Sequence, residues 1–155
     1  LGTSEDFGIS PIKSLTTEFK ASFLPSKIIK QFKSAHEEDV NCIAISPDGS
    51  KVVTGGNDKK VVIYNSINGQ PLSYLQGALK SIMYVAFNTP GDLVLATSND
   101  NSIKIYQTES RSLKHTLTGH LQNIYSARFL GPSTLVSGNL PIITIFIIRL
   151  IGSNS

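Results

Sequence analysis

The chain has 155 residues and a formal net charge of +3, from 14 Lys and Arg against 11 Asp and Glu. This positive charge is mild and scattered, which argues against a dedicated nucleic-acid site, where cations gather on one face. Cys42 is the single cysteine, which excludes an intrachain disulfide framework and is typical of a reducing compartment.

Residues 1–26 contain Ser, Thr, Gly and two prolines, and they show no sustained apolar period. Such composition is typical of a linker or arm, and we assign residues 1–26 to one. Residues 27–32 (KIIKQF) are predicted to form a short strand that leads into the folded part of the chain.

The stretch from His36 to Tyr64 is repeated after forty-two residues. Its apolar positions recur twice more along the chain, as Val40, Ile43 and Ile45, then Ile82, Val85 and Phe87, then Ile124, Ala127 and Phe129. A fixed period in the low forties, with several short apolar runs in each unit, is typical of a β-propeller blade of four strands.

The repeat divides residues 27–138 into blades at about 36–75, 78–117 and 120–138. The predicted strands are 40–45, 51–55, 61–64 and 71–75 in the first blade, 82–87, 92–97, 102–106 and 112–117 in the second, and 124–129 and 133–138 in the third. The fold class is therefore all-β: an incomplete propeller with about two complete four-stranded blades and a partial third.

The apolar residues of the innermost strands follow the spacing i, i+3, i+5 in all three copies. Strict alternation of side chains along a strand cannot produce this spacing. A β-bulge after the first position restores the facing of the others, so we expect one in each inner strand.

Residues 139–155 depart from the repeat, and we treat them as a divergent tail. The run Ile142 to Ile148 is apolar at every position but Thr144, which is unlike a strand with one solvent-facing side. We interpret the tail as non-native sequence, from a foreign reading frame or an unspliced intron. The run is prone to aggregate, although pairing as a surrogate third strand would blunt the open edge of the third blade.

Propellers close with typically about 4–8 blades. The chain after its arm has room for fewer than three, and it begins at Leu1. We therefore expect it to be a piece of a larger protein.

The spacing of polar residues resembles that of WD40-repeat propellers. In that family a histidine before the inner strand, a Ser or Thr, an aspartate and a Trp-Asp pair form a buried network in each blade. The first blade offers His36, Thr54, Asp58 and Tyr64. The second blade has Asp100 and Tyr106 but carries Ala78 and Ala96 in place of the histidine and the Ser/Thr, and the third retains Gly119, His120 and Ser137. The resemblance implies a structural role for these residues.

A narrower resemblance covers about residues 25–138. Phe32-Lys33-Ser34-Ala35-His36, Leu113–His120 (LKHTLTGH) and Ser126–Phe129 (SARF) resemble the C-terminal propeller of the autophagy-related protein 16 family. That propeller is an adaptor surface, while other parts of those proteins direct lipidation of ubiquitin-like modifiers on membranes. The resemblance implies a fragment of an autophagy adaptor that is cytoplasmic and recruited to autophagosomal precursor membranes.

No Gly-rich phosphate loop, zinc-ligand spacing or nucleophile elbow occurs in the sequence. We therefore predict no catalytic residue, no cofactor, no metal and no small-molecule substrate, and assign the chain as a non-enzyme that binds proteins, with membrane association only through partners or regions outside this sequence. Three alternatives stay open: a generic WD40 scaffold, a truncated product without function, and a propeller that contacts nucleic acid through Lys51, Lys59, Lys60 and Lys80.

Loops before the inner strands and turns before the third strands of propeller blades meet at one face. Polar and large side chains from these segments are therefore predicted to form a protein-binding rim. The predicted rim residues are Glu38, Asp39, Asn41, Asn57, Lys80, Met83, Asn99, Asn123 and Tyr125.

Overall fold

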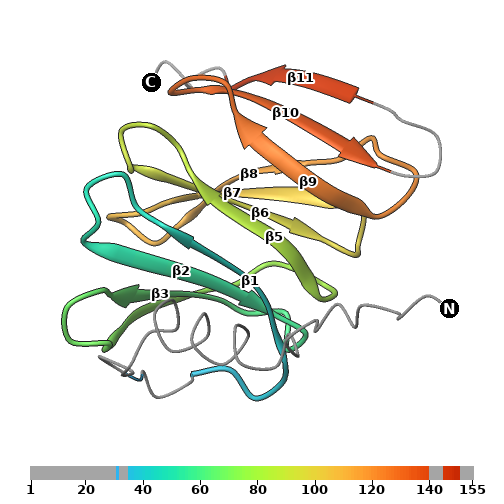
Figure 1. Cartoon of the computed structure of the whole chain (residues 1–155). Coiled ribbons are helices and arrows are strands. Elements are labelled where there is room, and N and C mark those ends of the chain that lie inside the picture. The colour runs from blue at the N-terminus through green and yellow to red at the C-terminus, as the bar shows by residue number, and fades with distance from the viewer. Residues whose placement is uncertain (1–30, 32–34, 140–144, 151–155) are drawn as a thin grey trace, which may run out of the picture. The chain divides into compact units, whose positions relative to one another are not determined.

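The structure, a computed structural model, describes residues 31, 35–139 and 145–150 (Figure 1). The chain divides into two units, residues 1–31 and 32–155, and every described strand belongs to the second unit. The predicted strand at 27–32 and the assigned arm at 1–26 lie outside the described residues, apart from Gln31.

Within the described residues, eleven strands form three antiparallel sheets, which we call blades 1, 2 and 3. Blade 1 has the order β1-β2-β3-β4, with strands Val40–Ile45, Lys51–Gly56, Val61–Asn65 and Pro71–Leu75. Blade 2 has the order β5-β6-β7-β8, with strands Ile82–Phe87, Leu93–Ser98, Ser102–Gln107 and Leu113–Leu117. Blade 3 has three strands, β9 Ile124–Phe129, β10 Thr134–Asn139 and β11 Ile145–Arg149, in the order β9-β10-β11.

No helix occurs among the described residues, and blade 2 lies between the other two (Figure 1). The predicted all-β class, with two complete four-stranded blades and a partial third, is confirmed. The ten strands predicted from the repeat all form, with ends within one residue of the predicted ones.

Tight turns join the first two strands of blades 1 and 2. Gly49 and Gly91 adopt φ of 71° and 79°, a region that glycine enters without steric cost. In blade 1 the Gly49 amide donates to the Ser46 carbonyl at 2.9 Å. The Asp48 carboxylate accepts hydrogen bonds from the hydroxyl groups of Ser46 and Ser50. These bonds, that of Ser46 most of all, hold the pKa of Asp48 well below its ordinary value.

Each innermost strand contains the predicted irregularity. The register shifts between Val40 and Cys42 in β1 and between Ile82 and Tyr84 in β5. In blade 3 the register shifts between the pair Gly138–Ser126 and the pair Asn139–Ile124, so the bulge lies at the start of β9. The three bulges are confirmed, and they let the second and third apolar residues of each inner strand share a face with the first.

Two apolar clusters hold the blades together. Blade 1 contributes Val53, Val61, Ile63 and Leu75 to the first cluster, and blade 2 contributes Ile82, Val85, Val94, Ala96 and Tyr106. In the second cluster, Leu93, Leu95, Ile103 and Ile105 of blade 2 meet Ile124, Ala127 and Leu135 of blade 3. Leu95, Ile103 and Ile105 are the forty-two-residue equivalents of Val53, Val61 and Ile63, so one packing geometry is used twice.

The segment beyond residue 138, treated as a divergent tail, contributes β11 to blade 3. Leu135 pairs with Ile148 and Val136 pairs with Ile147. These pairs match Val94 with Tyr106 and Leu95 with Ile105 in blade 2, so β11 has the register of a third strand. The surrogate third strand therefore forms.

Candidate protein-binding surface

The loops before the inner strands meet the turns before the third strands at one end of each blade. In blade 1 the Asn57 amide donates to the Asp39 carbonyl at 2.9 Å, and in blade 2 the Asn99 amide donates to the Ser81 carbonyl at the same distance. These two bonds are equivalent under the forty-two-residue shift. Asp39 and Asn57 are therefore brought together, as are the segments that carry Lys80 and Asn99.

The predicted rim residues differ in how much of their surface they offer. Asn57, Met83, Asn99 and Asn123 are half-buried. Glu38, Asp39, Asn41, Lys80 and Tyr125 are exposed, with Tyr125 showing 50% of its surface. The exposed members combine two carboxylates, one amine, one amide and one phenol, which suits hydrogen bonding around an aromatic contact.

Asn41 also has a structural role that the sequence did not reveal. Its side-chain amide donates to the Asn57 side-chain oxygen at 2.7 Å and to the Ile82 carbonyl at 2.9 Å. The second bond crosses from blade 1 to blade 2. A comparable bond runs from the Asn101 side chain of blade 2 to the Leu121 carbonyl ahead of β9, at 3.3 Å. Asn41, a predicted rim residue, therefore also links the β2–β3 turn of blade 1 to β5 of blade 2.

A buried polar network lies beneath the rim in blade 1. His36 Nδ1 is 2.9 Å from Asp58 Oδ1, and His36 Nε2 is 2.7 Å from Thr54 Oγ1. The Asp58 carboxylate also accepts from the backbone amides of Glu37 and Lys60. Burial acts to raise the pKa of Asp58, but the bond from His36 and the two amides outweigh it and leave the pKa below its ordinary value. The network pins the loop at 36–39 to the β2–β3 turn.

Tyr64, the aromatic residue of the first blade, bonds the backbone just ahead of His36. The Tyr64 hydroxyl accepts from the Ala35 amide at 3.1 Å. Tyrosine thus anchors the backbone just before the histidine.

Blade 2 replaces the missing histidine with a lysine. Lys104 is cross-strand from Ala96, the equivalent of Thr54, so its side chain lies on the face that carries the network in blade 1. Its Nζ is 3.8 Å from Asp100 Oδ2, and both side chains are less than a tenth exposed. Asp100 also accepts from the amides of Leu79 and Ser102 and from the Ser102 hydroxyl. In the sequence, the one sign of this role was the place of the lysine inside the largely apolar run 102–106 (SIKIY).

Blade 3 keeps a shorter network. His120 Nε2 lies 2.7 Å from Ser137 Oγ, as His36 lies from Thr54, and both residues are buried. Burial lowers the pKa of His120, with a hydrogen bond to Asn139 acting in the opposite direction. Each blade thus has a buried polar contact close to the loop before its inner strand, beside the apolar clusters.

The described residues contain no group of three or more His, Cys, Asp or Glu side chains placed to hold a metal ion. Cys42 is half-buried, and burial raises the pKa of its thiol to about 11, which disfavours the reactive thiolate at neutral pH. No helix in the described part of the chain is long and apolar enough to cross a membrane.

Comparison with known proteins identifies both the repeat and the fold. The WD domain, G-beta repeat family matches residues 26–65 and 69–107. Protein tipD of Dictyostelium discoideum is 39% identical over 67 residues, which cover 43% of this chain and 11% of that protein. The chain thus spans about a tenth of the length of this relative.

Two solved structures share the fold. The structure of U3-55K has a TM-score of 0.64 and that of the RRP9 WD40 repeats has 0.65. Each is 19% identical and covers 68% of this chain and 34% of that one, a likeness that shows the fold alone. With two matched repeats over half of its length, and blades that pack as the repeat predicts, this chain belongs to the WD40-repeat family.

Proposed function

We propose that this chain is a non-catalytic protein-binding scaffold that forms part of an autophagy adaptor. The observation that carries the proposal is the rim itself. Exposed Glu38, Asp39, Lys80 and Tyr125 come from three blades whose loops are held from below by His36, Lys104 and His120. A mixed polar and aromatic surface on rigid elements is the anatomy of a protein-interaction site.

The autophagy assignment is supported by the likeness of residues 25–138 to the propeller of the autophagy-related protein 16 family. The segments Leu113–His120 and Ser126–Phe129 carry this likeness, and in the structure they form β8, the following loop and β9. On this proposal the chain is cytoplasmic and is recruited to autophagosomal precursor membranes through a protein partner.

Charge reversal tests the rim. The variant Asp39→Lys with Lys80→Glu reverses two exposed rim charges without changing the net charge. We expect at least a fivefold loss of recruitment of the tagged chain to precursor membranes in starved cells, counted by co-localisation with the lipidated ubiquitin-like modifier. The matched control is Glu109→Lys with Lys114→Glu, two exposed residues at and after the β7–β8 turn, and it should behave as wild type.

The two parts of the proposal fail differently. Normal recruitment of the rim variant would show that another surface binds the partner. A wild-type chain that never reaches these membranes would refute the autophagy assignment.

The nucleic-acid alternative is less well supported by the positions of its lysines. Lys51 begins β2, whereas Lys59 and Lys60 follow its other end, about 17–20 Å away for a six-residue strand. Lys60 Nζ also pairs with Glu37 at 2.8 Å. The four cations therefore do not form one patch. Binding to single-stranded RNA that weakens steeply between 50 and 200 mM salt would favour this alternative.

A further inference from the structure

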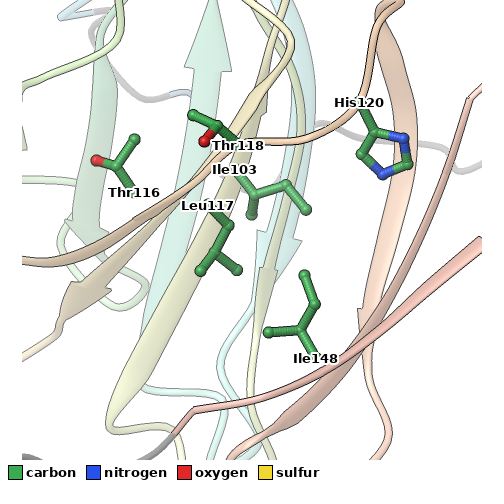
Figure 2. Close-up of a pocket in the computed structure, with 6 residues that line it drawn as sticks. All are labelled: Ile103, Thr116, Leu117, Thr118, His120 and Ile148. Atoms are coloured by element: carbon green, nitrogen blue, oxygen red, sulfur yellow. The ribbon is translucent and has the colours of Figure 1, made fainter.

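A cavity of about 400 Å³ lies between blades 2 and 3. Figure 2 shows Ile103 of β7 and Leu117 of β8 on one side and Ile148 of β11 facing them. Among the described residues, Thr116, Thr118 and His120 also line it, from the end of β8 and the loop that follows. Three of these six residues are aliphatic, and the three polar ones place hydroxyl and imidazole groups at the end of β8 and in the following loop.

The equivalent space between blades 1 and 2 is filled by an aromatic ring. Tyr106 is 1% exposed and belongs to the cluster that contains Val61 and Leu75. Ile103 and Leu117, which line the cavity, are the equivalents of Val61 and Leu75 in blade 2. The residue in register with Tyr106 in blade 3 is Ile148, because Leu135 pairs with Ile148 as Val94 pairs with Tyr106. The cavity is therefore lined by the isoleucine that stands where blade 2 has Tyr106.

The polar end of the cavity corresponds to the place where the tyrosine hydroxyls lie. In blade 1 the Tyr64 hydroxyl accepts from the amide of Ala35, next to His36. In blade 2 the Tyr106 hydroxyl lies close to Gly77, where an added Cβ would be 3.9 Å from it. The corresponding residues of blade 3 are Gly119 and His120, and His120 lines the cavity. A ring with a hydroxyl or N–H group at its far end matches this arrangement of apolar walls and polar end.

We propose that this cavity is a binding site for a phenol or indole ring. Apolar cavities of roughly 150 Å³ lined by aliphatic side chains already bind benzene, so the volume is sufficient for a single ring. The ring packs against Ile103, Leu117 and Ile148, and its polar atom lies at the Gly119–His120 end. The ring can come from a free small molecule or from a Tyr or Trp side chain of a protein, and the test separates these sources.

The experiment titrates the full chain at low micromolar concentration with p-cresol and with indole. Binding is followed by ligand-observed saturation-transfer NMR and by the midpoint of thermal unfolding. We expect saturable binding of one ring per chain, and at ten times the dissociation constant the folded-to-unfolded ratio should rise about elevenfold. A parallel titration with the peptides Gly-Gly-Tyr-Gly-Gly and Gly-Gly-Trp-Gly-Gly reports whether a side chain in a peptide also enters.

Matched variants locate the site. Ile148→Tyr fills the cavity and should abolish p-cresol binding, while Ile147→Tyr, on the opposite face of β11 and 70% exposed, should leave it unchanged. Tyr106→Ile should create a second site between blades 1 and 2 and raise the stoichiometry to two. Absence of saturable binding to wild type, or equal binding by Ile148→Tyr, would overturn the proposal. If Ile148→Tyr fails to fold, the wild-type chain decides the question. The NMR chemical shifts of the Ile103 and Ile148 methyl groups should both change when p-cresol is added, because a ring in the cavity contacts both side chains, and unchanged shifts would overturn the proposal.

Discussion

At the scale of single residues, the blade interiors contain a few buried polar groups that bond one another. His36 is the central one, because its two ring nitrogens bond Asp58 and Thr54 while the side chains of His36 and Asp58 are 0% and 4% exposed. Buried polar groups of this kind contribute only modestly when satisfied and cost much more when a partner is removed. The rim loop at 36–39 therefore depends on one imidazole.

The variant His36→Ala should lower the free energy of unfolding by about 3 kcal/mol, since it removes the imidazole that bonds both the buried Asp58 carboxylate and the Thr54 hydroxyl. Denaturant unfolding followed by circular dichroism measures this change. His115 is a half-buried residue of β8, and His115→Ala is the control, which should cost less than about 1 kcal/mol. Equal effects of the two variants would contradict the assignment.

His120 makes stability depend on pH. Burial lowers its pKa in the folded chain. The unfolded chain, with a His pKa of about 6.5, therefore takes up a proton more readily. It follows that stability falls as the pH drops below about 6.5, until the folded histidine also titrates. His120→Gln carries no titratable ring, and its unfolding midpoint should vary less than that of wild type between pH 7 and 5. If the unfolding midpoints of wild type and His120→Gln change equally with pH, His120 is not the source of the pH dependence.

At the scale of strands and blades, close backbone approach sets the contact between blades 1 and 2. A Cβ added to Gly55 of β2 would lie 2.3 Å from Ile82 Cγ2 and 2.9 Å from Cys42 Sγ. β2 can therefore approach β5 only because residue 55 has no side chain. Gly131, in the β9–β10 turn, has nothing within 4 Å of the same added atom.

Gly55→Ala should accordingly destabilise the chain by about 2 kcal/mol, the cost of overpacking a close contact. Gly131→Ala should change stability by less than about 0.5 kcal/mol. The double variant Gly55→Ala with Ile82→Ala also removes Ile82 Cγ2, the atom with which the new methyl group would clash. Its loss of stability should therefore be smaller than the sum of the losses in the two single variants. Strict additivity in the denaturant midpoints would mean that the Gly55 position is not crowded.

The repeat predicted the blades well because strand residues alternate and turn glycines such as Gly49 occupy fixed positions in each unit. It also predicted the bulges, since the spacing of Val40, Ile43 and Ile45 has no other simple explanation. The role of Lys104 was missed because a lysine in a strand ordinarily faces solvent, and only the pairing with Ala96 shows what it replaces. The cross-blade bond of Asn41 depends on the Ile82 carbonyl, a backbone atom that no pattern of side chains reports.

At the scale of the whole unit, the end blades differ from the central one. Ile82, Val85 and Phe87 of β5 face blade 1, and the first two are almost completely buried. Their equivalents in β1, Val40, Ile43 and Ile45, are 47%, 70% and 63% exposed. At the other end, Ile147 is 70% exposed although its equivalent Ile105 is 0% exposed. Positions that bury their side chains in blade 2 are thus open to solvent in blades 1 and 3.

These open faces should make the 155-residue chain self-associate in solution. A repeat unit stabilises its apolar flank by packing on a neighbour, so a flank without one is a surface for another copy. We expect sedimentation velocity at tens of micromolar to show species larger than a monomer. Ile43→Thr with Ile45→Thr keeps β-branched residues in β1 but replaces its two most exposed apolar side chains with smaller, polar ones, and it should shift the distribution toward monomer. Ile67→Thr alters a residue that is 77% exposed in the β3–β4 turn, away from any blade face, and should leave the distribution unchanged. A single monomeric boundary for wild type, with cooperative unfolding, would show that the open faces do not drive association.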